Sequence, residues 1–230
     1  MIRTSGSRGK RPTLTRFARI IPMSIGLVCV LATAGLVLLG PAAAQDGSDA
    51  MEVEAPTGHI ALDNPADLPD ERSEAVYQSI LKGMIDGYRM SDDPTAEDYG
   101  SWRRFNRAPY RSAQHGERFV NNYANGIGEG YGRFEAVGRL PVGAILVKDS
   151  FTVTEDGEVF AGALFLMEKM PQGFNPPSRD WRYSMIMPDG ALLGETGGEG
   201  ADAVEFCITC HELAGDNLDH LFLIPEDYRN

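Results

Sequence analysis

The sequence predicts an α+β domain, built mainly of an antiparallel β-sheet with flanking helices. Apolar side chains recur at steps of three and four between residues 76 and 88, which is a helical period. Beyond about residue 131 the period becomes extended, and short apolar runs are separated by turn signals such as Asp156-Gly157 and Pro188-Asp189-Gly190. Because these runs are joined by short turns, neighbouring strands should be antiparallel.

The first 44 residues are typical of a secretory signal peptide. Six basic residues and no acidic residue precede the apolar run from Ile20 to Leu39, and Pro41-Ala-Ala-Ala44 then resembles a cleavage site. An uncleaved membrane anchor is the alternative, because the apolar run is about long enough to span a bilayer. We therefore expect export to the periplasm and cleavage near Ala44. Cys29 would leave with this segment, so that no disulfide framework remains.

The exported part of the chain is strongly acidic. All 33 acidic residues but only 15 of the 21 Lys and Arg residues lie in residues 45–230, which therefore carry a formal charge of −18. Such a charge makes nucleic acid an improbable partner. It would steer a basic redox partner, such as a basic cytochrome c, towards the surface, although a solvated acidic surface that favours solubility fits equally well.

Two helices and an arm are expected before the sheet. Residues 45–70 are rich in Asp, Glu, Ala and Pro and predict a flexible arm, which leaves residues 71–230 as the folded domain. A helix should begin at Asp70 and end near residues 87–90. A second helix is predicted from about Ser112, with Phe119, Val120, Tyr123 and Ala124 on one face, and with glycines at 126, 128 and 130 ending it.

The predicted strands fix which side chains share a face. Strands are expected at Val142–Val147, which Phe151–Thr154 continues, and at Val159–Met167, Trp181–Met187 and Ala191–Leu193. A two-residue turn at Asp156 and Gly157 would place Lys148 opposite Phe165, and Glu168 opposite Ile145. Alternation along each strand then puts Lys148 and Glu168 on opposite faces of the sheet.

The chemically specific motif is Cys207-Ile208-Thr209-Cys210-His211, near the C-terminus. Its Cys-x-x-Cys-His spacing is that of a c-type haem attachment site, where both thiols bond to haem vinyl groups and the histidine ligates the iron. Half of a zinc site or a redox-active cysteine pair are the alternatives. Outside the motif, residues 45–230 contain no further cysteine and only three histidines, His59, His115 and His220, which are few candidates to complete a tetrahedral zinc site. We therefore expect the domain to carry a C-terminal covalent haem c, with its iron ligated by His211.

Several segments in a fixed order resemble the cytochrome P-460 family, whose relatives include the β-rich cytochromes c-prime-beta. The resemblance covers the chain from about Trp102 to the end. Its carriers are His115–Val120 with Tyr123, Pro141–Lys148, Leu164–Met170, Asp180–Tyr183, and Cys207–His211 followed by Asp219, Phe222 and Pro225.

The resemblance implies a five-coordinate haem beneath an open distal site. It implies that Lys148 is bonded covalently to the porphyrin edge, beside the thioether residues Cys207 and Cys210, and that Glu168 is a proton relay. The predicted register puts Lys148 and Glu168 on opposite faces of the sheet, where they could not share one distal site. Either a bulge near residues 149–151 therefore shifts the register, or Glu168 is not the relay. Lys169, which this register puts on the same face as Lys148, is the second choice for the relay. Members of the family are commonly homodimers.

Three functions follow as expectations. The first is oxidation of hydroxylamine to nitrous oxide or nitric oxide, with electrons passed to a redox partner. The second is a nitric-oxide carrier or scavenger of the c-prime-beta type, without the crosslink and with an apolar cap from Phe105, Tyr110 or Phe151. The third is simple electron transfer, with a methionine or His115 as the sixth iron ligand.

Overall fold

The computed structural model describes residues 65–230. The predicted signal peptide and residues 45–64 of the predicted arm lie outside the described residues. Within the described range no helix is both long and apolar enough to cross a membrane. The end of the predicted arm belongs to the fold, because Pro65 forms a β-bridge with Thr154 and the Ala66 N–H donates to the Val153 carbonyl at 2.7 Å.

An eight-stranded sheet forms the centre of the described chain, and its strand pairs are all antiparallel, as predicted. Its main order is β1-β3-β4-β6-β7-β8, with β2 paired to β3 and β5 paired to β4. The strands are β1 (Arg103–Arg104), β2 (Tyr110–Ser112), β3 (Arg118–Ala124), β4 (Ile145–Val153), β5 (Val159–Ala161), β6 (Leu164–Lys169), β7 (Trp181–Ile186) and β8 (Leu192–Glu195).

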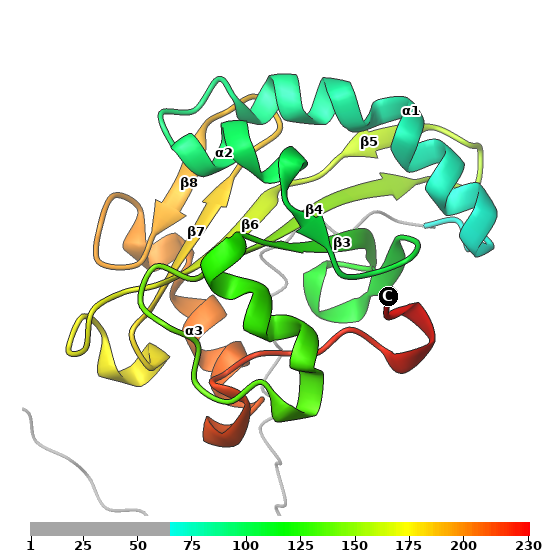
Figure 1. Cartoon of the computed structure of the whole chain (residues 1–230). Helices are drawn as coiled ribbons and strands as arrows, with labels where there is room; N and C mark the ends of the chain where they lie inside the picture. Colours follow the sequence, from blue (N-terminus) through cyan, green and yellow to red (C-terminus); the bar gives the residue numbers. More distant parts are fainter. Residues whose placement is uncertain (1–64) are drawn as a thin grey trace, which may run out of the picture. The chain divides into compact units, whose positions relative to one another are not determined.

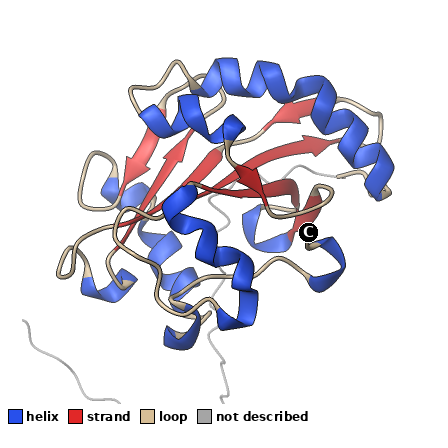
Figure 2. Ribbon diagram, in the orientation of Figure 1, coloured by secondary structure: helices blue, strands red, loops and turns tan. Residues whose placement is uncertain are grey.

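Helices cover both faces of this sheet. Helices α1 (Asp70–Tyr88) and α2 (Pro94–Asp98) lie over one face, and α3 (Glu205–Glu212) and the 3-10 segment η3 (Gly126–Ala136) lie on the other side (Figures 1 and 2). Further 3-10 segments are η1 (Tyr99–Ser101), η2 (Ala113–His115), η4 (Pro176–Ser178), η5 (Ala201–Ala203), η6 (Asp216–Leu218) and η7 (Glu226–Tyr228). The predicted fold class of a mainly antiparallel sheet with flanking helices is confirmed.

Helix α1 confirms the first predicted helix. Its acidic first turn, Asp70 and Glu71, suits the positive end of the helix dipole, and Pro69 precedes it. Its buried side chains Tyr77, Met84 and Tyr88 share one core with residues of the facing strands, including Phe119, Phe151 and Ile186. The second core lies on the other sheet face and joins strand residues to η3, α3 and the C-terminal segment. It contains Val120, Ala124, Leu146, Trp181, Tyr183, Tyr131, Ile208, Leu221 and Ile224.

The predicted second helix is wrong, because residues 118–124 form strand β3. Phe119 and Tyr123 enter the core beneath α1, whereas Val120 and Ala124 enter the opposite core. A strand that is buried on both faces has apolar residues at adjacent positions, and pairs at i, i+1, i+4 and i+5 imitate a helical period. The glycines at 126, 128 and 130 fall within η3 instead.

The predicted register between β4 and β6 is confirmed, although the turn differs. Lys148 opposes Phe165 and Ile145 opposes Glu168. Strand β5 pairs one residue out of this register, since Val153 opposes Val159, and the loop at residues 155–157 has Gly157 at φ 84°. An extra residue around Gly162, whose N–H donates to the Ser150 carbonyl at 2.7 Å, restores the register before β6.

Candidate functional site

Helix α3 carries the Cys-x-x-Cys-His motif. Cys207, Cys210 and His211 stand at positions i, i+3 and i+4, which share one face of a helix. Both cysteines are free thiols and are partly buried. The helix begins directly after Val204, which is fully buried against Ala163 and Met185 and so holds the helix start on the sheet.

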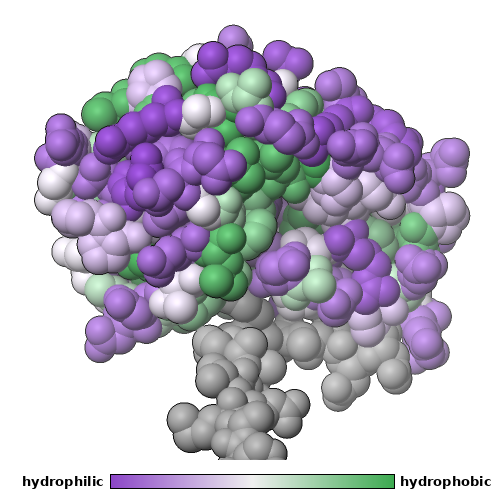
Figure 3. Space-filling model, turned by 90° about the horizontal axis from the view of Figure 1, so that it is seen from below, coloured by the Kyte–Doolittle hydropathy of each residue, from purple (hydrophilic) through white to green (hydrophobic). Residues whose placement is uncertain are grey.

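A cavity that is partly open to solvent lies between α3 and the sheet. Its walls include Gln114, His115, Asn122, Leu146, Lys148, Phe165, Met167, Tyr183, Phe206, Cys207, Cys210, His211, Leu221 and Phe222. Seen from below, hydrophobic residues form a band between hydrophilic areas on this side of the molecule (Figure 3). The structure thus brings the two cysteines and the histidine of the motif together with Lys148 in one largely apolar cavity.

His211 has the geometry of a metal-ligating histidine. Its Nδ1 lies 2.8 Å from the carbonyl oxygen of His220, and since a carbonyl only accepts, Nδ1 carries the hydrogen. Burial, with the nearby charge of Lys148, lowers the pKa of His211 to about 3, so the ring is neutral. The lone pair of a neutral ring with this tautomer lies on Nε2, the atom that could bind iron.

Lys148 projects from β4 between Asn122 of β3 and Phe165 of β6. Burial lowers the pKa of its amine to about 8, while the charge of a Cys210 thiolate acts in the opposite direction. A fraction of this amine is therefore neutral, and hence nucleophilic, near neutral pH. Within residues 65–230 the amine makes no hydrogen bond or ion pair with another side chain.

Tyr183 and Cys207 support the fit of a large cofactor to this cavity. The Tyr183 hydroxyl is buried and has no hydrogen-bond partner within the described residues, which costs free energy unless a bound group satisfies it. Burial, reinforced by Cys210, raises the pKa of the Cys207 thiol to about 12, so this thiol is protonated. The two thiols, the histidine and the unsatisfied hydroxyl suit a covalently attached haem.

The structure does not bring Glu168 to this cavity. Its carboxylate pairs with Arg182 on the α1 face of the sheet, where a separate polar pocket also includes Asp92, Asp93 and Glu195. The confirmed register is the cause. Lys148 opposes Phe165, and because side chains alternate along β6, Phe165 and Glu168 point to opposite faces of the sheet. The relay assignment implied by the resemblance is thereby corrected.

The second choice, Lys169, is on the Lys148 face as predicted, but it does not line the cavity. Its side chain is 1% exposed and its Nζ lies 2.6 Å from the Asp219 carboxylate. Its position in the sequence gives no sign of this ion pair, because the partner lies fifty residues away in the chain.

The predicted distal cap residues are also misplaced. Phe105 and Tyr110 lie in the core around η3, and Phe151 lies beneath α1. The phenylalanines of the cavity are Phe165, Phe206 and Phe222. His115 does line the cavity: its ring is 4.9 Å from the ring of Phe165, and its Nδ1 is 2.8 Å from the Ser112 hydroxyl.

The chain matches no protein-family model, and no curated protein is significantly similar to it in sequence. The function therefore has to be argued from the residues and their geometry.

Proposed function

We propose that this chain is an exported, periplasmic mono-haem c-type cytochrome, in which Cys207 and Cys210 hold the haem by thioether bonds and His211 ligates the iron. The observation that carries the proposal is the His211 ring. Its Nδ1 donates to the His220 carbonyl, which leaves the Nε2 lone pair for a metal, and it lines the same cavity as both thiols. This is the arrangement that a ligating histidine requires.

The haem would supply a redox-active iron with a coordination position open to small nitrogen ligands. We propose that the Lys148 amine bonds to a carbon of the porphyrin edge, because Lys148 lines the same cavity as Cys210 and has its pKa lowered to about 8. This bond would replace one N–H and one ring C–H bond, so its formation would release two protons and require a two-electron oxidant, such as a peroxide, during maturation. A covalent nitrogen at that edge would alter the electronics and the planarity of the ring, two properties by which a protein tunes its cofactor.

We propose hydroxylamine as the substrate and oxidation to nitrous oxide or nitric oxide as the reaction. Phe165, Phe206 and Phe222 give the cavity apolar walls that limit water. The oxidation releases protons together with electrons, and His115, whose imidazole lines the cavity, would accept them in place of Glu168. An external acceptor, such as a basic cytochrome c, would take the electrons, in keeping with the charge of −18 on residues 45–230.

A nitric-oxide carrier or scavenger is the second candidate, and one observation favours it. Within the described residues no carboxylate lines the cavity. A gas carrier needs an open iron in an apolar pocket but no proton relay, so the same walls would serve it. In that case Lys148 would remain an unmodified amine.

The experiment that separates these functions is anaerobic turnover of hydroxylamine with an external electron acceptor. The wild-type protein should reduce the acceptor, and its reduced form should show a strongly red-shifted Soret band. Lys148→Leu should lose both properties while retaining the thioether-bound haem. Lys82→Leu is the matched control, because Lys82 is 88% exposed on α1. Nitric-oxide binding without turnover, together with an ordinary Soret band, would establish the carrier instead.

A further inference from the structure

The turn at Asp219 and His220 is held in an unfavourable backbone conformation. Their φ angles are 54° and 62°, in the left-handed region that residues other than glycine seldom adopt. Two such residues in succession cost free energy and persist only where the surroundings determine the conformation. The carbonyl that orients His211 belongs to the second of them.

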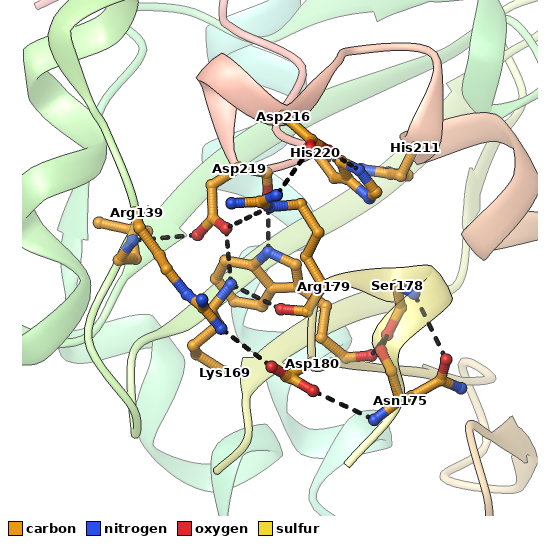
Figure 4. Close-up of polar contacts among 12 residues, drawn as sticks. Arg139, Lys169, Asn175, Ser178, Arg179, Asp180, His211, Asp216, Asp219 and His220 are labelled. Atoms are coloured by element: carbon orange, nitrogen blue, oxygen red, sulfur yellow. Dashed lines mark hydrogen bonds and ion pairs between the residues drawn. The ribbon is translucent and has the colours of Figure 1, made fainter. Parts of the chain in front are cut away.

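Asp219 is the centre of the contacts that fix this turn (Figure 4). One carboxylate oxygen accepts from Lys169 Nζ at 2.6 Å and from Arg179 Nε at 3.4 Å, and the other accepts from the Leu140 N–H at 3.0 Å. Its backbone carbonyl accepts from Trp181 Nε1 at 2.7 Å. Three separate segments of the chain therefore hold one residue.

The arrangement is costly if its purpose is stability alone. Lys169 and Asp219 are 1% and 0% exposed, and burying two charges removes about as much free energy of hydration as their attraction returns. A buried ion pair of this kind is better suited to fixing one geometry than to raising the free energy of unfolding. The geometry fixed here is that of the residue immediately before His220.

We propose that Asp219 is a positioning residue: by fixing the turn that carries the His220 carbonyl, it sets the orientation and donor strength of His211 towards the iron. The inference rests on the proposed haem. A hydrogen bond from Nδ1 to a fixed acceptor makes the other ring nitrogen a stronger donor. A stronger histidine donor stabilises ferric iron and lowers the reduction potential.

The test compares Asp219→Asn with the wild-type holoprotein in resonance Raman spectra and redox titrations. We expect a lower iron–histidine stretching frequency and a shift of the ferric–ferrous equilibrium towards ferrous iron of about tenfold, or about 59 mV for one electron. Trp181→Phe, which removes the bond to the Asp219 carbonyl but keeps an aromatic ring beside Lys169, should change both readouts in the same direction and to a smaller extent. This second variant decides the question if Asp219→Asn does not fold.

Loss of a negative charge would by itself raise the potential, so a second comparison separates charge from position. Lys169→Met combined with Asp219→Asn removes both charges of the pair. We expect the frequency and the potential to stay shifted in this double variant, and a return of both to wild-type values would overturn the proposal. Glu168→Gln is the matched control, because its carboxylate pairs with Arg182 on the other sheet face, and it should shift neither readout.

The two proposals fail in different ways. Wild-type protein that carries haem, with unchanged frequency and potential in every Asp219 and Trp181 variant, would overturn the positioning role alone. Wild-type protein without haem would overturn both. Haem-loaded protein that shows the expected shifts but no hydroxylamine turnover would support the positioning role and overturn only the proposed reaction.

Discussion

Lys148 and Glu168 project from opposite faces of the central sheet. Lys148 opposes Phe165 and lines the cavity of His211, whereas Glu168 opposes Ile145 and pairs with Arg182 on the α1 side. A strand cannot turn one of these side chains to the other face without a shift of register. The two residues therefore cannot act on one bound molecule, and each makes a separate prediction.

Replacing Glu168 by Gln should leave the haem spectrum and any hydroxylamine turnover within about twofold of the wild type, because the side chain is remote from the cavity. Steady-state kinetics across neutral pH would measure this. A turnover that falls tenfold or more in Glu168→Gln would show that the carboxylate reaches the reaction.

Replacing His115 by Gln should slow turnover by about a hundredfold to ten-thousandfold and flatten its pH dependence, since general acid–base catalysis contributes on this scale. Nitric-oxide binding should change little, because it requires no proton transfer. The pH profile of turnover is the measurement. An unchanged profile would exclude His115 as the proton acceptor.

Asp149 should make the free energy of unfolding depend on pH. It is fully buried and accepts from Tyr77 at 2.6 Å, Tyr99 at 3.3 Å and Asn121 at 3.0 Å. Burial raises its pKa from 3.8 to about 6, against these hydrogen bonds and the charge of Arg104. Because the folded-state pKa is the higher one, the folded state binds this proton more tightly than the unfolded state does. Its stabilising contribution is present below pH 3.8 and is lost as the pH rises through about 6.

The expected loss is about 3 kcal/mol between those pH values, at about 1.4 kcal/mol for each pKa unit. Urea unfolding of wild-type protein and of Asp149→Asn at a series of pH values would measure it. The difference between the two proteins should grow over this range and then level off. A difference that does not vary with pH would contradict the raised pKa.

The bulge at Gly162 should not tolerate a side chain. A Cβ there would lie 2.2 Å from the Ser150 hydroxyl oxygen and 3.1 Å from the Ser150 carbonyl oxygen. Gly162→Ala should therefore lower the free energy of unfolding by about 1–3 kcal/mol, the usual cost of overpacking. Gly126→Ala is the control, because nothing lies within 4 Å of its Cβ. Equal stability of the two variants would show that the bulge can relax.

The sequence predicts the sheet and the first helix well because their patterns are local. Apolar runs bounded by turn residues identify β4, β6 and β7, and the stripe that includes Tyr77 and Met84 identifies α1. It fails at β3, where burial on both faces removes the alternation that marks a strand. It also gives the β4–β6 register correctly from a turn that does not exist, because a three-residue loop and the Gly162 bulge compensate each other.

The candidate site, like the fold, is predicted by the sequence only in part. Cys207, Cys210 and His211 follow from their spacing alone, and Lys148 is placed in their cavity. The contacts of Tyr183, Lys169 and Asp219 could not be predicted from the sequence, because their environment is made by segments far apart in the chain. The Glu168 assignment failed because a resemblance in linear order does not fix the face of a strand.

The most direct test of the account is peptide mapping of the purified, exported protein by mass spectrometry. We predict one haem joined to the peptide that contains Cys207 and Cys210, and a bond from the same haem to the peptide that contains Lys148. An unmodified Lys148 peptide would remove the crosslink and with it the enzyme proposal. Unmodified cysteines, with no haem mass on the protein, would contradict the central claim.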